Sequence, residues 1–136
     1  MDRCLNVSLR RANRVLNKIY DRHLQECGLT GGQFSLLRVI NFRKKTSNRE
    51  LQNILLTDQT TLTRGLKPLI RDGYLDVSKG DDQRVKLLSL SPTGAALYRE
   101  ASKCWEASQE EVKLRLGAES TEQLLAITDI VSELNS

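Results

Sequence analysis

Hydroxyl and cationic side chains gather in one predicted helix, over about residues 57–71, for which Thr57 is the expected cap. Serine, threonine, lysine and arginine side chains hydrogen-bond to phosphate oxygens and to base edges, and an α-helix fits the major groove of B-DNA. This composition therefore indicates contact with double-stranded DNA. The candidate DNA-binding residues of the helix are Gln59, Thr60, Thr61, Thr63, Arg64 and Lys67.

The position of each side chain along this helix predicts what it contacts. Gln59, Thr60 and Thr61 lie in the first turn, where free backbone N–H groups also face the groove. The alternative interpretation is that these three residues only cap the helix and face solvent, without contacting DNA. Arg64, one turn further on, suits a guanine edge or a phosphate, whereas Lys67 suits a phosphate. The leucines of the helix are assigned to the core: Leu62, Leu66 and Leu69.

A predicted β-hairpin with a polar tip, SKGDDQR, follows this helix directly. Residues 74–78 and 85–90 alternate like strands on either side of the turn. Arg84 has two readings: it extends into the minor groove, or it pairs with Asp82 and holds the hairpin closed. The hairpin also carries exposed cations that are candidate DNA contacts, although solvation would explain them equally well: Lys79, Arg84 and Lys86.

Other helices must hold these two surfaces in place. Apolar residues recur at helical spacing over about residues 2–26, and Thr30 is placed to cap a second helix over 31–42. Ser47 and Glu50 form a capping-box pattern at the start of a short third helix. The order of short helix, hydroxyl-rich helix and hairpin predicts a winged helix-turn-helix.

The C-terminal part of the chain predicts two more helices. Ser91-Pro92 opens the first, which runs to about residue 116, and Gly117 separates it from a final helix capped by Ser120. The first helix and the last two helices carry broad apolar stripes. The predicted winged helix-turn-helix is too small to cover all of them. Uncovered apolar surface usually marks an interface, which indicates a two-fold homodimer with a shared helical core.

Length and composition limit the classes of protein that fit. A chain of 136 residues makes one domain, and an aromatic content of 4% points to a helical core of aliphatic side chains. The net charge of +4 and the pI near 9.1 favour a polyanionic partner. No apolar run is long enough for a membrane span and no secretory signal is visible, so a cytoplasmic location is expected.

Nothing in the sequence indicates catalysis or a cofactor. There is no nucleophile–base pair, no plausible site of paired carboxylates and no glycine-rich phosphate loop, so we expect neither an enzyme nor a cofactor. His23 is the only histidine, and Cys4, Cys27 and Cys104 lack the spacing of a zinc site, so no metal is expected. The three thiols are interpreted as reduced, small, buried side chains.

Three motifs together resemble the MarR family of bacterial transcription regulators. TTLTRGLKPLIRDGYL is similar to the family's recognition helix and its exit into the wing, and LTGGQFSLLRVI is similar to its second helix. DDQRVKLLSLSPTG resembles the wing signature Asp-x-Arg followed by Leu-x-Leu-Thr-x-x-Gly, with Ser91 in place of the threonine. The matching positions are Asp82, Arg84, Leu88, Leu90 and Gly94.

The resemblance implies a mainly α fold with a small β-hairpin wing. It implies a single MarR-like domain over residues 1–136, with a winged helix-turn-helix lobe at about 30–91 and helical dimerisation regions at about 1–27 and 92–136. The implied function is sequence-specific DNA binding by a homodimeric transcriptional repressor at a pseudo-palindromic operator. A small anionic or phenolic effector would bind between the dimer core and the lobe and release the DNA.

Two alternative functions remain open. Some members of the family sense organic hydroperoxides through a cysteine on the first helix, and Cys4 lies slightly before that place, so Cys4 is a candidate redox residue. Pro68 removes a backbone donor within the recognition helix and predicts a kink, and the wing is shorter than usual. A helical protein-interaction module that has lost DNA binding would explain both departures.

A basic loop precedes the short third helix. Its cations either support the DNA backbone or are simply solvated: Arg43, Lys44 and Lys45.

Overall fold

The computed structural model describes residues 3–135 as six α-helices, one 3-10 turn and a two-stranded antiparallel hairpin. The prediction of a mainly α chain with a small hairpin is confirmed. The elements in chain order are α1 (Leu5–Leu24), η1 (Gln25–Cys27), α2 (Gly31–Arg43), α3 (Asn48–Leu55), α4 (Gln59–Arg71), β1 (Leu75–Lys79), β2 (Lys86–Leu90), α5 (Pro92–Leu116) and α6 (Ala118–Glu133).

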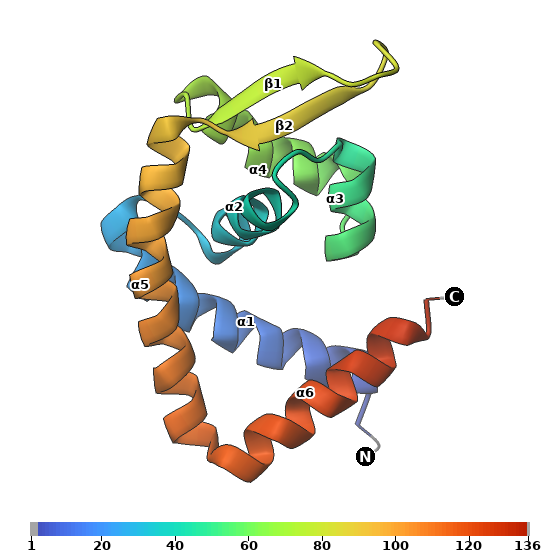
Figure 1. Cartoon of the computed structure of the whole chain (residues 1–136). Coiled ribbons are helices and arrows are strands. Elements are labelled where there is room, and N and C mark those ends of the chain that lie inside the picture. Colours follow the sequence, from blue (N-terminus) through green and yellow to red (C-terminus); the bar gives the residue numbers. More distant parts are fainter. Residues whose placement is uncertain (1–2, 136) are drawn as a thin grey trace.

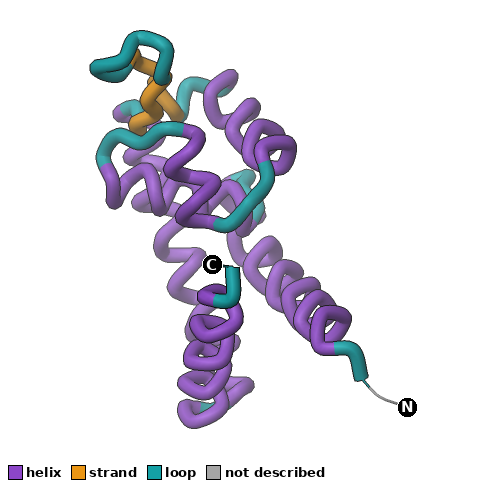
Figure 2. The backbone as a smooth tube through the Cα atoms, turned by 90° about the vertical axis from the view of Figure 1, so that its right-hand side faces the viewer, coloured by secondary structure: helices purple, strands orange, loops and turns teal. Residues whose placement is uncertain are grey.

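Two parts of different shape make up the molecule (Figure 1). Helices α2, α3 and α4 and the hairpin gather into one unit, here called the lobe, which extends from α2 to β2. Helix α5 leads away from the hairpin, passes the lobe and packs against α1. Helix α6 turns back from the far end of α5, so that α1 and α6 form two separate limbs below the lobe (Figure 2).

The core lies where α2 meets α4, β2 and α5. Phe34, Leu37 and Ile40 of α2 are at most 2% exposed, as the helical spacing predicted. The ring of Phe34 stacks on Tyr98 and on Trp105 of α5, with ring centroids 5.5 and 5.9 Å apart. The α4 leucines that were assigned to the core are also buried: Leu62, Leu66 and Leu69.

Two predicted helix caps are confirmed. The Thr30 hydroxyl accepts a hydrogen bond from the Gln33 N–H at 3.2 Å, and the Gln33 side chain accepts one from the Thr30 N–H at 3.1 Å. Ser47 and Glu50 form the same reciprocal pair at the start of α3. Because these bonds satisfy donors that a helix leaves free at its start, they fix where α2 and α3 begin.

The predicted cap of α4 is wrong by one residue. Asp58 rather than Thr57 caps this helix, since the Asp58 carboxylate accepts the Thr61 N–H at 2.7 Å and α4 begins at Gln59. A carboxylate is favoured at this position by the positive end of the helix dipole. The Thr57 N–H instead donates to the carbonyl of Gln52 at 3.2 Å and closes the end of α3.

The predicted cap of α6 is also wrong. Helix α6 begins at Ala118, directly after Gly117, so Ser120 already lies inside its first turn. Gly117 has a φ of 85°, a left-handed conformation that glycine adopts without the steric cost of a Cβ atom. The residue that ends α5 therefore also starts α6, and no side chain is needed to cap it.

The hairpin is tied to the lobe by a contact that the sequence pattern did not predict. β1 and β2 pair with Lys79 opposite Lys86 beside the turn, and both strands begin one residue later than expected. Thr46, in the loop between α2 and α3, forms a bridge to Leu88, with N···O distances of 3.0 and 2.8 Å. This bridge fixes the base of the hairpin to the helices of the lobe.

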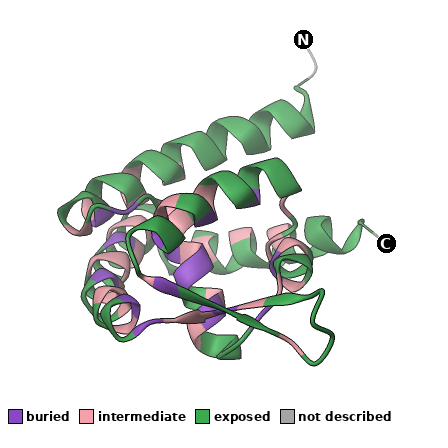
Figure 3. Ribbon diagram, turned by 90° about the horizontal axis from the view of Figure 1, so that it is seen from above, coloured by how far each residue is buried: buried purple, intermediate pink, exposed green. Residues whose placement is uncertain are grey.

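Large apolar side chains lie exposed on both limbs. Leu125, Ile127 and Ile130 of α6 are 53%, 55% and 63% exposed, and Val15 of α1 is 58% exposed. In Figure 3, the helix that starts at the N-terminus is exposed over most of its length. Between residues 3 and 135, no helix combines the length and the apolar character needed to cross a lipid bilayer.

Candidate nucleic-acid interface

Helix α4 has a buried face and an exposed polar face. Its buried leucines lie against α2 and α3, while Thr60, Arg64 and Lys67 are exposed. These three residues are spaced by four and three positions, so they form one row on the side of the helix opposite the leucines. A hydroxyl and two cations in a row on the exposed face of a helix suit the polar floor and phosphate walls of a major groove.

The exposed row continues beyond the residues that the sequence predicted to contact DNA. Arg71 lies one turn beyond Lys67 at the end of α4 and is exposed. Its Nε donates to the carboxylate of Asp72 at 3.0 Å, and this hydrogen bond holds the pKa of Asp72 below its usual range. The spacing of four from Lys67 was the signal that could have identified Arg71.

The remaining candidates on α4 lie beside this row rather than in it. The Thr61 N–H, and after it the Thr61 hydroxyl, which donates to Asp58 at 2.9 Å, hold the pKa of Asp58 low, so Thr61 is part of the cap. Gln59 is exposed at the first helical position. Thr63 faces the hairpin, on the wall of a groove described below. Helix α4 continues through Pro68 to Arg71 without a break.

A groove of about 480 Å³ separates α4 from the hairpin. Thr63 and Lys67 of α4 lie on one wall, Lys86 of β2 on another, and Asn48 at the start of α3 closes one side. The groove thus brings together three candidates that are far apart in the sequence. Its two ammonium groups and its hydroxyl and amide groups provide hydrogen-bond donors that suit a phosphate backbone.

At the tip of the hairpin, Arg84 pairs with Asp82. The guanidinium donates from Nε at 3.2 Å and from Nη2 at 3.1 Å, and the Arg84 N–H donates to the same carboxylate at 3.0 Å. These bonds hold the pKa of Asp82 low. Of the two readings of Arg84, the structure shows the closed turn, although the side chain is still 90% exposed. Asp81 and Asp82 offset Lys79 and Arg84, so the tip is not a basic patch.

The basic loop between α2 and α3 is partly neutralised. Arg43 donates to Glu50 at 2.7 Å, and this hydrogen bond is the main reason that the pKa of Glu50 is lowered. Lys44 and Lys45 are exposed and immediately precede Thr46, which bridges to β2. Two of the three cations therefore lie in the loop that Thr46 joins to β2.

A second cavity, of about 620 Å³, lies between the lobe and α1. Asn13 of α1, Gln33 of α2 and Arg64 of α4 line it, so three elements meet there. Helices α2 and α4 approach closely beside it, because a Cβ atom on Gly65 would lie 2.9 Å from a methyl group of Leu36. The cavity shares Arg64 with the exposed face of α4.

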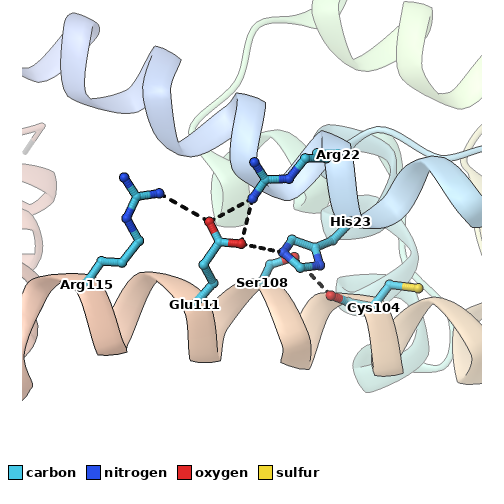
Figure 4. A network of polar contacts seen from close by, with 6 residues as sticks. All are labelled: Arg22, His23, Cys104, Ser108, Glu111 and Arg115. Atoms are coloured by element: carbon cyan, nitrogen blue, oxygen red, sulfur yellow. Dashed lines mark hydrogen bonds and ion pairs between the residues drawn. The ribbon is translucent and has the colours of Figure 1, made fainter.

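A polar network joins α1 to α5 (Figure 4). Arg22 donates to both carboxylate oxygens of Glu111 at 2.6 and 2.7 Å, and His23 Nε2 lies 2.9 Å from Oε1. Arg115 adds a contact of 3.3 Å from within α5. Hydrogen bonds from His23 and Arg22 lower the pKa of Glu111 from 4.5 to about 2. The only histidine thus contributes to the α1–α5 joint.

This network gives a prediction for acid stability. A folded-state pKa below the unfolded value means that ionised Glu111 stabilises the fold, fully above pH 4.5 and progressively less as the pH falls to about 2. We expect Glu111→Gln to unfold more easily than the parent at neutral pH and equally easily near pH 2. Urea unfolding across this range measures the difference. A constant difference at every pH, or one equal to that of the neighbouring Glu110→Gln, would contradict the assignment.

The thiols do not match the prediction that all three are buried. Cys4 is exposed and precedes the first residue of α1. Cys27 and Cys104 are half-buried, and their sulfur atoms lie 3.9 Å apart although 77 positions separate them in the sequence. Within residues 3–135, no cluster of three or more histidine, cysteine, aspartate or glutamate side chains is arranged to hold a metal ion.

Comparison with known proteins identifies the family. The sequence profile of the MarR family matches residues 29–86, which run from just before α2 to the first residue of β2. The M. tuberculosis transcriptional regulator MosR, solved in complex with DNA, is 34% identical, with 97% of this chain and 98% of that chain covered and a TM-score of 0.82. The chain belongs to the MarR family.

Further relatives of this MarR-family chain are more distant. A cysteine-to-serine mutant of E. coli MarR, complexed with operator DNA, shares the fold at a TM-score of 0.84 and 23% identity, with 93% and 92% of the two chains covered. An uncharacterized HTH-type transcriptional regulator of Bacillus subtilis, YwoH, is 26% identical over 100 residues, 74% of this chain and 73% of that protein. The similarity therefore extends beyond the segment that the MarR profile matches.

Proposed function

We propose that this MarR-family protein is a transcriptional regulator that binds operator DNA through α4 and the hairpin. The observation that carries the proposal is the exposed row of Thr60, Arg64 and Lys67 opposite the buried face of α4. Arg64 reads a guanine edge or holds a phosphate, and Lys67 and Lys86 contact phosphates on the two sides of the groove between helix and hairpin. MosR and E. coli MarR, both solved with DNA, support the proposal.

The regulator acts in the cytoplasm as a homodimer. The exposed apolar side chains of α1 and α6 support this assignment, because a second copy related by a two-fold axis would cover the same surface on each subunit. A two-fold dimer presents two copies of α4, which reach successive major grooves when they lie roughly 34–36 Å apart. A pseudo-palindromic operator follows from this symmetry, and its occupancy blocks transcription.

A small anionic or phenolic effector releases the operator. The cavity between α1, α2 and α4 supports this part of the proposal, since a ligand seated there contacts both a dimerisation limb and the reading helix. Arg64 and Gln33 offer donors to an acidic oxygen, while Leu36 and Leu62 offer apolar contact to a ring. Such a ligand binds better to a dimer whose two α4 helices have a spacing that does not match the operator. It therefore shifts the population away from the DNA-bound form.

Titration of a fluorescent duplex from the upstream region of the protein's own gene tests the proposal. Lys67 and Lys86 on each of two subunits release about four counterions, so affinity should fall on the order of 100-fold between about 50 and 200 mM salt. We expect tight binding of that duplex, weak binding of a scrambled one, and sedimentation of the free protein at twice the chain mass.

The outcomes separate the proposal from its alternative. Equal, weak binding to specific and scrambled duplexes across several upstream regions would contradict operator recognition and favour a helical protein-interaction module. Sedimentation at the mass of one chain would contradict the dimer but not the DNA-reading surface. In that case, a duplex carrying only one half of the operator would bind as tightly as the whole.

A further inference from the structure

The closest pair of unassigned reactive groups is Cys27 and Cys104. Cys27 ends the η1 turn and Cys104 lies in the middle of α5, and their sulfur atoms are 3.9 Å apart. A disulfide has a sulfur–sulfur distance of about 2.05 Å, so the two sulfur atoms must approach each other by roughly 2 Å for the bond to form. Each thiol is the hydrogen-bond partner of the other, so no competing contact must be broken.

Backbone contacts hold both cysteines in place. The Gly28 N–H donates to the carbonyl of Gln25 at 2.9 Å and closes the turn that carries Cys27. On α5, the carbonyl of Cys104 accepts the Ser108 hydroxyl at 2.9 Å (Figure 4). The turn and the helix are also in contact with each other. The approach of the two thiols is therefore a property of packed elements rather than of a free loop.

The surroundings select the kind of oxidant that can react. Burial, followed by the hydrogen bond and the charge of Cys104, raises the pKa of Cys27, and Glu100 and Glu26 raise it further. The two carboxylates disfavour the approach of anionic oxidants. A neutral hydroperoxide does not meet this electrostatic barrier.

We propose that Cys27 and Cys104 form an oxidation site that closes to an intrachain disulfide on reaction with a hydroperoxide. One thiol gives up its proton and attacks the peroxide, the O–O bond breaks, and an alcohol leaves with the proton, so that the sulfur becomes a sulfenic acid. The second thiol attacks this sulfur, its proton combines with the leaving hydroxide, and water departs. Two thiols lose two electrons and two protons, and the hydroperoxide is reduced to alcohol and water.

The bond would close a loop around the whole lobe. Residues 28–103 lie between the two cysteines and include every element from α2 to β2. Cys104 also precedes Trp105, whose ring stacks on Phe34 of α2 and lies under the guanidinium of Arg38, 4.5 Å from the ring centroid. Oxidation therefore ties the lobe to α5 beside the aromatic contact that joins them.

Peptide mapping of the wild-type protein tests this site directly. The reduced full-length chain is treated with tert-butyl hydroperoxide, alkylated and digested. We expect a linked Cys27–Cys104 peptide, an intact mass lower by two hydrogens, a single-chain band on a non-reducing gel, reversal by dithiothreitol, and an alkylated Cys4. The melting temperature should rise on the order of 10 °C, because the long closed loop restricts the unfolded chain.

Variants identify the residues responsible. Cys104→Ser and Cys27→Ser should abolish both the linked peptide and the rise in melting temperature, whereas Cys4→Ser should keep both. Oxidation confined to Cys4, a disulfide between two chains, or an unchanged count of free thiols at Cys27 and Cys104 would overturn the proposal. Since the measurement needs no DNA, its failure would leave the proposed operator binding untouched, and the reverse also holds.

Discussion

Gly94→Ala is expected to lower the free energy of unfolding by about 3 kcal/mol, because there is no room for a Cβ atom at this position. A Cβ atom built on Gly94 would lie 1.9 Å from the carbonyl oxygen of Tyr74, and both partners belong to the backbone. This carbonyl also accepts the Ser91 N–H at 3.0 Å, so it is held in place. Accommodating a methyl group must therefore separate the start of α5 from the start of β1.

Urea unfolding followed by circular dichroism measures this loss. The matched control is Gly32→Ala in the first turn of α2, where the nearest atom to a new Cβ would be the Thr30 hydroxyl at 3.8 Å, an ordinary contact. We expect the control to unfold at or above the midpoint of the parent, with similar dependence on urea in all three proteins. A Gly94→Ala protein as stable as the control would show that the joint between hairpin and α5 is not closely packed.

Arg64→Ala is expected to weaken operator binding by roughly 5- to 150-fold, equivalent to about 1–3 kcal/mol. Arg64 is exposed on the side of α4 opposite the buried leucines, so its removal takes away a charged donor without opening the core. The same substitution should leave the melting temperature within about 2 °C of the parent, because exposed positions away from packed contacts change stability little.

A fluorescence titration at several salt concentrations measures the loss and also classifies it. A guanine contact would show as reduced discrimination against a duplex altered at one base pair, whereas a phosphate contact would lower the salt slope by about 1 for each contact removed. Arg99→Ala on α5, an exposed arginine outside the lobe, is the control and should bind like the parent. Equal affinities for the Arg64 variant and this control would refute a reading role for α4.

The sequence predicts those features that depend on residues close together in the chain. The capping boxes at Thr30 and Ser47 each involve a residue three positions on, and the leucines of α4 repeat at helical spacing. Both patterns are short-range and need no knowledge of the fold. The prediction failed at α4, where Thr57 and Asp58 are adjacent and both suitable as caps, because only the backbone geometry decides between them.

The candidate site was predicted in part for the same reason. The row of Thr60, Arg64 and Lys67 follows from the period of a single helix. The same period also extends the row to Arg71. The groove that joins Lys67 to Lys86 depends on how the hairpin packs, which no spacing along the chain determines. The two readings of Arg84 were open in the sequence, and only the folded turn shows it paired with Asp82.

By itself, then, the sequence determined the helices, the hairpin, the exposed row on α4 and the family to which the chain belongs. Only the tertiary structure decided the bridge between Thr46 and Leu88, the network around Glu111 and the contact between Cys27 and Cys104. The physical reason is separation along the chain. Local patterns are fixed by helix and turn geometry, whereas contacts across 42 to 89 positions exist only once the core has brought α1, α5 and the lobe together.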